Sequence, residues 1–360
     1  MPVHRGGFFG QVVRAAYPLS IANLSIRNDP VVGDALAKYG SMMAIPLFDN
    51  GEPLNWAITL KEEPGGYSME ELEESVMRSN LGGAMVKNAI MTKQLREAND
   101  AIRREIEHIA QIQRALLPAA IPRIPGLSIG VHYETFDQAG GDMYALRPLR
   151  PLPGGAPVGD ACCDACGPWG ILIADVSGHG PAAAVVMAMM QAIFDAYPRE
   201  PEGPAEVLEH ANRHLFAKRI EHQFVTALFA IYDPGTRRLT YARAGHNPPV
   251  WMRPAQGGGW DMAHLDRVGG IPLGILEDVS YEEASIDLEP GQTLLLYTDG
   301  ITEAASPAGD MFGVAGIEAS LTECTGEPEC AITHITETLK KHEDEVRPDD
   351  DQTIVVMRVI

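Results

Sequence analysis

The stretch ILIADVSGHG, residues 171–180, joins an apolar run to a glycine-rich turn through Asp175. Ile171 to Ala174 predicts a buried strand, because a short apolar run bounded by turn residues is typical of one. Gly178 to Gly180 allows the chain to turn, and Pro181 is favourable at the first position of a helix. The sequence therefore predicts a strand, a turn and a helix, with the Asp175 carboxylate held where the strand ends.

Three further aspartates occupy similar positions. Asp142 follows two glycines that allow close approach of the backbone, Asp299 follows an apolar run, and Asp350, together with Asp351, precedes the apolar C-terminal run. Each one alone is typical of a turn or a helix cap. As a set at strand ends they favour a site for a hard cation, because such cations prefer carboxylate oxygens as ligands.

Around these aspartates, residues 120–360 mix strands and helices without the alternation of a parallel sheet. Strands are predicted at Leu127–Tyr133, Ile171–Asp175, Phe224–Tyr232, Leu239–Ala244, Thr293–Tyr297 and Thr353–Ile360, and helices at Pro181–Tyr197, Ala205–Ile220 and Ala331–Asp344. Asp233 to Thr236 predicts a tight hairpin between two of the strands. The pattern favours an α+β fold in which antiparallel sheets are covered by helices.

A long helix is predicted from Ser68 to Leu117. Ser68 and Glu71 form the pattern of a capping box. Gly82-Gly83 predicts a break or a close contact between helices. Pro118 is the first of three prolines that end the helix.

Apolar residues in the second half of this helix recur every seven positions. Leu95, Ile102, Ile109 and Leu116 share one heptad position, and Asn99, Ile106 and Gln113 fill the second. This pattern predicts a short coiled coil and a parallel homodimer through residues 95–116. The alternative is an ordinary amphipathic helix that packs on its own domain.

Residues 1–66 predict a small α+β domain. Ser41 to Phe48 and Leu54 to Leu60 predict two strands joined by an Asn-Gly turn at residues 49–51. With the predicted helix at Pro30 to Tyr39, this segment resembles the second half of a GAF domain. The resemblance covers only that half, so we expect a partial GAF-like sensor, either shortened or degenerate.

Composition limits the classes of partner. The chain carries 49 acidic and 28 basic residues, for a net charge of −21. A surface of this charge repels nucleic acid and anionic lipid. No run of about 18 uninterrupted apolar residues predicts a membrane span, and the N-terminus lacks the apolar region of a secretion signal. We therefore expect no nucleic acid, no membrane and a cytoplasmic location.

Five cysteines, an odd number, fit a reducing compartment. Cys162, Cys163 and Cys166 cluster in a segment rich in proline and glycine, Pro151 to Gly167. A zinc site would need a fourth ligand, which Cys324 or Cys330 could supply only if the fold brought it near. A surface loop with free thiols is the simpler interpretation.

Residues 105–360 resemble a bacterial PPM-type protein phosphatase of the branch that regulates sporulation and stress-response sigma factors. The motifs that carry the resemblance occur in the family order: Gln111-Ile112-Gln113 with Leu116-Leu117-Pro118, Ile124-Pro125-Gly126, GGDMY at 140–144, DVSGHG at 175–180, Ala244 to Pro249, TDG at 298–300 with Glu303, and DDQT at 350–353. So many concordant motifs make the resemblance specific.

The resemblance implies an antiparallel β-sandwich flanked by helical layers and a centre for two Mn²⁺ or Mg²⁺ ions. It implies metal ligation by Asp142, Asp175, the Val176 carbonyl, Asp299 and Asp350, listed here in chain order. Asp175 would bridge both ions, and Asp175 and Asp299 would be the catalytic residues. Asp350 is preferred over Asp351 because the family motif places the ligand three residues before the threonine. The ions would activate a water that attacks phosphorus.

The same resemblance implies the substrate class, a phosphoserine or phosphothreonine on a regulatory protein. The usual target in the family is an anti-sigma-factor antagonist of the STAS type. His179 is expected to shape its turn, with a catalytic role left open, and His246 to hydrogen-bond a loop near the site. The predicted domains are therefore the partial GAF-like domain at 1–66, a helical linker at 67–118 and a phosphatase domain at 119–360.

The chain departs from the family pattern in two places. Ala145 stands where the family usually has an acid, and the segment from Arg147 to Trp169 is longer than usual, which could alter substrate access. Ala145 and the incomplete sensor leave an alternative function open, a catalytically weak or inactive phosphatase fold that acts as a regulator or scaffold. A diguanylate cyclase is disfavoured, because Met143 and Tyr144 replace the acidic and aromatic pair that its motif requires, and a GAF module alone would not need residues 120–360.

Overall fold

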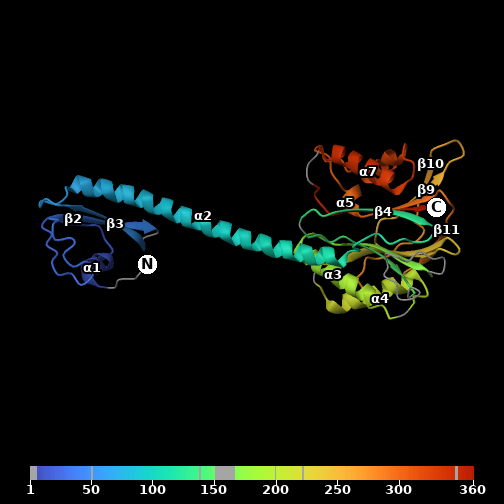
Figure 1. The fold of residues 1–360 in the computed structure, drawn as a ribbon, viewed down its shortest axis with the longest axis horizontal. Coiled ribbons are helices and arrows are strands. Elements are labelled where there is room, and N and C mark those ends of the chain that lie inside the picture. The colour runs from blue at the N-terminus through green and yellow to red at the C-terminus, as the bar shows by residue number, and fades with distance from the viewer. Residues whose placement is uncertain are drawn as a thin grey trace. The chain divides into compact units, whose positions relative to one another are not determined.

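The computed structural model describes residues 6–49, 52–137, 139–150, 167–198, 200–220, 223–344 and 348–360. The chain forms two compact units, Met1–Arg103 and Arg104–Ile360 (Figure 1). Within the described ranges, no helix combines the length and the apolar character needed to cross a membrane. The predicted surface loop with Cys162, Cys163 and Cys166 lies outside the described residues.

The N-terminal unit holds a three-stranded antiparallel sheet. Helix α1 (Gly7–Ala15) packs beside strands β1 (Leu19–Ile21), β2 (Ser41–Asp49) and β3 (Glu52–Lys61), in the order β1-β2-β3. Val12, Met42 and Ala44 are among its buried core residues. The predicted pairing of the two strands is confirmed, since β2 and β3 pair along their full length; the turn at 50–51 lies outside the described residues.

The predicted helix at Pro30 to Tyr39 is wrong, because this segment is a series of turns. The Asp29 carboxylate accepts the N–H groups of Val31 and Val32 at 2.8 and 3.0 Å. Gly33 has a left-handed φ of 58°. A side chain that binds the nearby backbone, followed by a left-handed residue, competes with helical hydrogen bonds.

Helix α2 (Met69–Leu116) begins at the predicted capping box. The Glu71 N–H donates to Ser68 Oγ at 3.1 Å, and the Ser68 N–H donates to Glu71 Oε2 at 2.8 Å. The helix runs through Gly82-Gly83 without a break. A Cβ at Gly83 would lie 3.0 Å from the Phe48 carbonyl oxygen, so this glycine permits close contact with a strand and not with a second helix.

The C-terminal unit contains two antiparallel sheets between two helical layers (Figure 1). One sheet has the order β10-β9-β12-β13-β4 and comprises β4 (Leu127–Glu134), β9 (Val250–Pro254), β10 (Trp260–His264), β12 (Thr293–Tyr297) and β13 (Gln352–Val359). The other has the order β11-β8-β7-β6-β5 and comprises β5 (Met143–Pro148), β6 (Trp169–Val176), β7 (Val225–Asp233), β8 (Arg238–Ala244) and β11 (Glu283–Asp287).

Helices cover the outer face of each sheet. Helices α3 (Pro181–Asp195) and α4 (Pro204–Lys218) share a core with the β5–β8 side of the second sheet. Helices α5 (Asp299–Thr302), α6 (Gly313–Leu321) and α7 (Pro328–His342) share a core with the first sheet. The predicted α+β fold with antiparallel sheets between helices is therefore confirmed.

The central strands are apolar throughout because both of their faces are buried. In β12, Leu294 and Leu296 enter the core between the sheets, whereas Leu295 and Tyr297 face the helices. Trp169 lies in the core between the sheets and is fully buried. A strand with one exposed face alternates apolar and polar residues, whereas a strand with two buried faces is apolar at every position.

The sequence prediction missed several short elements. These are strands β1, β5, β9, β10 and β11 and helices α1, α5 and α6. Strands β10 and β11 lie at sheet edges, and β11 has the sequence EASID, with only one buried residue. Helix α5 has only four residues, too few to show a helical period.

Candidate functional site

Strand pairing brings Asp142 and Asp175 together. Strands β5 and β6 pair with Met143 opposite Ala174, so the next pair of residues at this end is Asp142 and Asp175. The Asp142 side chain hydrogen-bonds that of Asp175. The turn after Asp175 has the predicted form, with left-handed Gly178 and Gly180 before the helix that begins at Pro181.

The other sheet supplies Asp299 and Asp350 at a corresponding end. Strands β12 and β13 pair with Tyr297 opposite Ile354, and the Thr298 N–H donates to the Thr353 carbonyl at 3.1 Å. Asp299 comes directly after this pair on one strand, and Asp350 lies just before it on the other. The charges of Asp299 and Asp350 both act on Asp175. The four predicted acids therefore gather at one edge of the sandwich.

Asp142 connects the two sheets. Its Oδ2 atom accepts the hydroxyl of Thr298 at 2.7 Å and that of Thr353 at 2.6 Å, while its backbone begins the second sheet. The side chain is only 1% exposed. A buried carboxylate requires such partners, because an unpaired one is costly to remove from water.

The acids at this edge hold their protons strongly. Burial, followed by the charges of Asp299 and Asp350, raises the pKa of Asp175 to about 8. Burial, followed by the charges of Asp350 and Glu303, raises the pKa of Asp299 to about 6. Burial and the charge of Asp175 also raise the pKa of Asp142 well above its usual value. These carboxylates repel one another, and a cation among them would relieve that repulsion.

Asp351 plays a different part from Asp350. Its two oxygens accept the N–H groups of Phe136 at 2.8 Å and of Gly141 at 2.5 Å, and the side chain is buried. Asp350 is exposed, and one of its oxygens accepts the Asp351 N–H at 2.8 Å. This difference favours Asp350 as the residue that is free to bind a ligand.

The Gly140-Gly141 pair leaves space that a larger residue would fill. A Cβ at Gly141 would lie 2.7 Å from the Val176 carbonyl oxygen, and one at Gly140 would lie 2.3 Å from Asp351 Oδ2. The predicted need for close backbone approach is confirmed here. The space beside Val176 matters because its carbonyl is one of the predicted metal ligands.

The residues fit hard divalent cations in their donor chemistry. Carboxylate oxygens and one backbone carbonyl are the ligands that Mg²⁺ and Mn²⁺ prefer. Across the described ranges, no three His, Cys, Asp or Glu side chains already stand in a chelating arrangement. The four aspartates are close enough to repel one another, as the raised pKa values of Asp175 and Asp299 indicate. Because these described side chains are not yet in a chelating arrangement, they would have to turn toward a bound ion.

The two histidines of the motifs have different surroundings. His246 is buried, and burial together with Arg243 lowers its pKa to about 3, so the ring is neutral. Its Nδ1 lies 2.9 Å from Thr226 Oγ1, on a strand and not on the expected loop. His179 is exposed and packs edge-on against Phe136, with ring centres 5.0 Å apart.

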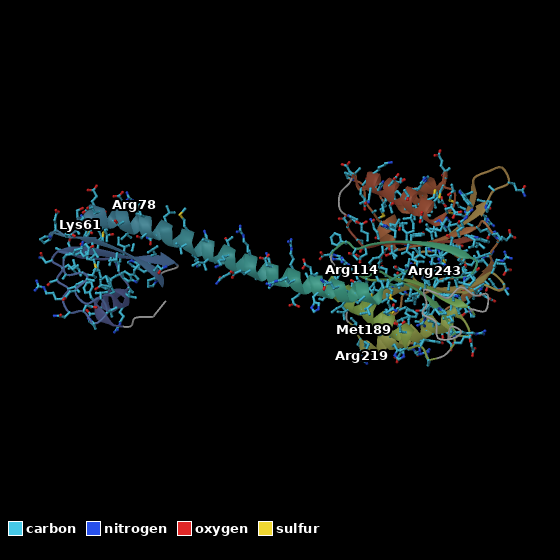
Figure 2. All side chains as sticks on the ribbon, viewed as in Figure 1. Lys61, Arg78, Arg114, Met189, Arg219 and Arg243 are labelled. Carbon is cyan, nitrogen blue, oxygen red and sulfur yellow. The ribbon has the colours of Figure 1, made fainter. Side chains whose placement is uncertain are left out.

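Arg243 holds the segment that carries His246. Arg243 lies in the C-terminal unit (Figure 2). Its guanidinium donates to the carbonyls of Val268 and His246. Burial lowers the pKa of Arg243. The Ala244 to Pro249 motif is therefore a structural support beside the site.

The sequence prediction missed three polar residues that position the acids. Thr298 and Thr353 lie inside recognised motifs, yet their bonds to Asp142 join residues 156 and 211 positions apart. Gln113 was assigned to a coiled-coil position. Its side chain is instead buried, donating to the Gly140 carbonyl at 2.6 Å and accepting the Gly140 N–H at 3.0 Å.

Ala145 has no polar role in this arrangement. It lies on β5 opposite Leu172, and its side chain packs against the core shared with α3 and α4. No acidic side chain therefore projects from this position of β5.

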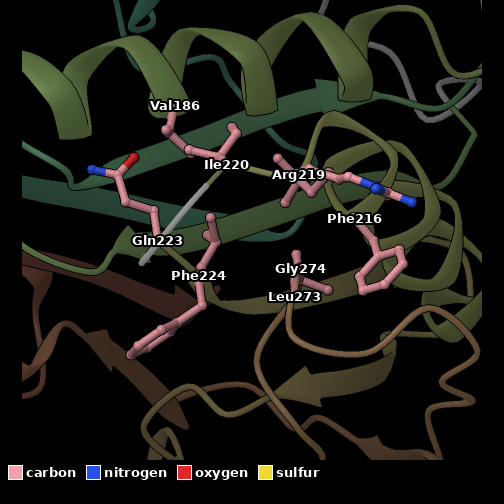
Figure 3. A pocket seen from close by; sticks show the side chains of 10 residues that line it. Val186, Phe216, Arg219, Ile220, Gln223, Phe224, Leu273 and Gly274 are labelled. Atoms are coloured by element: carbon pink, nitrogen blue, oxygen red, sulfur yellow. The ribbon is translucent and has the colours of Figure 1, made fainter.

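A pocket of about 340 Å³ adjoins the loop after Asp175 (Figure 3). Val186, Ile220, Phe224 and Leu273 contribute to its walls. Phe224 joins it to the site loop, because the Ser177 N–H donates to the Phe224 carbonyl and the Phe224 N–H to Ser177 Oγ, both at 2.9 Å. None of the described residues that line this pocket is acidic, and none of the four clustered aspartates is among them.

Comparison with known proteins agrees with the geometry. Residues 166–360, more than half of the chain, match the family described as Stage II sporulation protein E (SpoIIE). The phosphoserine phosphatase RsbU of Bacillus subtilis is 29% identical over 266 residues, which cover 73% of this chain and 72% of RsbU. The phosphoserine phosphatase RsbP of the same organism is 25% identical, over 56% of this chain and 46% of RsbP. The chain thus spans less than half of RsbP.

Solved structures share the fold. The SiaA-PP2C domain of Pseudomonas aeruginosa superposes with a TM-score of 0.57 at 22% identity, covering 73% of this chain and 99% of that domain. The RsbU and RsbW domains of Rv1364c from Mycobacterium tuberculosis superpose with a TM-score of 0.52 at 22% identity, covering 68% of this chain and 63% of that one. The chain belongs to the Stage II sporulation protein E family and is a PPM-type phosphatase.

Proposed function

We propose that this chain hydrolyses a phosphoserine or phosphothreonine on a regulatory protein, using a water activated by two divalent cations. The observation that carries the proposal is the gathering of Asp142, Asp175, Asp299 and Asp350 at one edge of the sandwich. Burial and the repulsion among these carboxylates raise the pKa values of Asp175 and Asp299, and a bound cation would offset both effects. A phosphate ester would also add negative charge there, so cations are needed for it to bind.

In this proposal Asp175, Asp299, Asp350 and the Val176 carbonyl would hold Mn²⁺ or Mg²⁺, and Asp175 would be the ligand common to both ions. Bound cations would lower the pKa of a water and neutralise phosphoryl charge. Asp175 and Asp299 must lose their protons before they can bind, because only the ionised carboxylate is a ligand.

Asp142 fixes the position of Asp175 by its hydrogen bond and would itself contact a metal directly or through water. Its Oδ2 is already occupied by the two threonine hydroxyls. Its other oxygen therefore carries any contact with a water or an ion. Asp351 holds the Gly141 backbone, which leaves space beside the Val176 carbonyl.

The test is an Asp175→Asn variant assayed on p-nitrophenyl phosphate with Mn²⁺ or Mg²⁺. We expect turnover to fall about 100-fold or more, as when a group that stabilises transition-state charge is removed. The fold should persist, since the substitution removes charge from a site of mutual repulsion. Asp261→Asn, which changes an exposed acid on β10, is the control and should leave turnover unchanged.

Unchanged turnover in Asp175→Asn would remove this residue from its role. The alternative function, a weak or inactive phosphatase fold that acts as a regulator, rests on Ala145. It predicts that the wild-type chain shows no hydrolysis at any concentration of either metal, so the same assay separates the two.

The proposed partner is a phosphorylated anti-sigma-factor antagonist of the STAS type. This follows from the family branch and from the phosphoserine phosphatases RsbU and RsbP, to which the chain is similar. A cytoplasmic location belongs to the same proposal. The N-terminal unit is proposed to be a partial GAF-like sensor, whose ligand the sequence does not identify.

A parallel homodimer through α2 is also part of the proposal, with a changed seam. Gln113 is buried against Gly140, and Ile109 and Leu116 pack on cores of their own unit, so these residues are not free for a partner helix. Residues farther toward the N-terminus are exposed and keep a spacing of three and four: Met77, Leu81, Ala84, Asn88, Met91, Leu95, Ala98 and Ile102.

Such a stripe is the heptad seam of a coiled coil, and Asn88 supplies the polar position that sets register. We expect the wild-type chain to be a dimer at micromolar concentration by light scattering. Leu95→Lys together with Ile102→Lys should convert it to a monomer. Ile90→Lys, exposed on the same helix but off the stripe, should leave it a dimer. A monomeric wild-type chain would contradict the proposal.

A further inference from the structure

Two cysteines meet where α6 leads into α7, outside the carboxylate cluster. Cys324 lies in the loop after α6, and Cys330 lies in the first turn of α7. Their sulfur atoms are 3.3 Å apart. A disulfide bond is about 2.05 Å long, so a small rotation of the two side chains would bring the sulfurs into bonding distance.

Cys330 is the more reactive of the two thiols. Its sulfur accepts the Thr325 N–H at 3.4 Å and the S–H of Cys324. Hydrogen bonds from the Thr325 side chain and backbone lower its pKa. The residue is only partly buried and lies at a helix N-terminus, which is the setting in which thiolates form and react.

Cys324 is the protected partner. It is buried, and burial raises its pKa to about 11. Its sulfur accepts the Gly326 N–H at 3.2 Å, and its carbonyl accepts the Trp260 indole N–H at 2.7 Å. These bonds hold the Cys324 sulfur beside Cys330, and a fixed neighbour reacts much faster than a free thiol in solution.

We propose that Cys324 and Cys330 form a thiol oxidation site that reacts with a hydroperoxide. The Cys330 thiolate attacks one peroxide oxygen, the O–O bond breaks, and the other oxygen leaves as water or an alcohol after taking a proton. Cys330 is then a sulfenic acid. The Cys324 sulfur attacks the Cys330 sulfur, the S–O bond breaks, and the hydroxyl leaves as water with the Cys324 proton. The two thiols lose two electrons, and the peroxide gains them.

The loop between the cysteines is tied to the first sheet at the ends away from the aspartates. The Thr293 hydroxyl, at the start of β12, donates to the Gly326 carbonyl at 2.9 Å. The guanidinium of Arg358, near the end of β13, donates to the Thr325 carbonyl at 3.1 Å. The oxidation site is therefore held in place independently of the metal centre, and the proposal does not rest on the phosphatase function.

The experiment treats the full-length reduced protein with hydrogen peroxide, blocks the remaining thiols and maps the peptides by mass spectrometry. Cleavage after glutamate separates the two cysteines at Glu329. We expect a disulfide-linked pair of peptides containing Cys324 and Cys330, which dithiothreitol separates. This map also distinguishes these residues from Cys162, Cys163 and Cys166.

Two single variants test the direction of the reaction. Cys324→Ala should leave Cys330 as a sulfenic acid that dimedone traps, whereas Cys330→Ala should leave Cys324 unmodified at the same dose. Peroxide that modifies Cys330 in Cys324→Ala but yields no linked peptides from wild type would overturn the proposal, as would faster trapping of Cys324 than of Cys330. If a variant does not fold, the wild-type map alone decides.

Discussion

Asp350 and Asp351 are adjacent in sequence, yet their surroundings differ, and so do the roles that we infer for them. Asp350 is exposed and acts electrostatically on Asp175 and Asp299. Asp351 is buried with both oxygens bound to backbone N–H groups. One residue is available to bind an ion, and the other holds the loop that leads to Asp142.

Substituting each one by asparagine should separate activity from stability. Asp350→Asn should keep its bond to the Asp351 N–H and leave stability little changed, while turnover falls about 100-fold or more. Asp351→Asn places an amide against an N–H donor and should lower the free energy of unfolding by about 1–3 kcal/mol. Hydrolysis of p-nitrophenyl phosphate and urea denaturation measure the two effects.

The reverse result, a stable and inactive Asp351→Asn beside an active Asp350→Asn, would exchange the two assignments. Asp349→Asn, the exposed acid that precedes both, is the matched control and should change neither quantity.

Among the elements, the C-terminal turn of α2 contacts the loop before Asp142, although its heptad pattern predicted a coiled-coil interface. Gln113 satisfies both backbone groups of Gly140, two residues before Asp142. The end of the helix thereby sets the position of a loop that belongs to the candidate centre.

Gln113→Ala should leave the buried N–H and carbonyl of Gly140 without partners. Each lost partner costs about 1–3 kcal/mol, and displacement of the loop should reduce turnover by at least about tenfold, the equivalent of 1.4 kcal/mol. Gln111→Ala changes an exposed residue of the same turn and should have neither effect. Wild-type turnover in Gln113→Ala would show that the helix end does not position the site.

The elements also show where sequence patterns are sufficient. Apolar runs such as Ile171 to Ala174 and Leu294 to Tyr297 predicted their strands because both faces are buried. The capping box at Ser68 predicted the start of α2 because its two bonds are local. The segment 30–39 was predicted wrongly because the Asp29 side chain and Gly33 change the backbone without changing the apolar pattern.

For the candidate site, the motifs predicted which acids lie close together, but not how they are held. The bonds of Asp142 to Thr298 and Thr353 depend on the alignment of two sheets, which no local pattern reports. Gln113 occupies a heptad position that is usually apolar, so the periodicity predicted that it lies in the coiled-coil interface. Its true partner, Gly140, lies 27 residues away and has no side chain to signal the contact.

For the molecule as a whole, the protonation of the carboxylate cluster should make the stability of the folded chain depend on pH and on bound metal. Asp175 and Asp299 have pKa values of about 8 and 6 when folded, above the ordinary value of an aspartate. The folded chain therefore binds more protons than the unfolded chain in this range. Its stability contribution from these groups falls as pH rises from about 4 to 8.

Mn²⁺ or Mg²⁺ should reverse this loss. Protons compete with the cation for the same oxygens, so the rise in melting temperature at a fixed metal concentration should be larger at pH 8 than at pH 6. Thermal denaturation with and without metal measures it, and Asp175→Asn should reduce the difference between the two pH values. An equal or larger rise at pH 6 would contradict metal binding by these carboxylates.

One atom, Asp142 Oδ2, receives hydroxyl bonds from two strands of the opposite sheet while its own chain begins the other sheet. The two sheets share an apolar core, and these two bonds add a polar cross-link at the edge that carries the acids. Sliding one sheet over the other would break both hydroxyl bonds and leave a buried carboxylate without partners, which is costly. The cross-link therefore opposes the motion that would separate the acids of one sheet from those of the other.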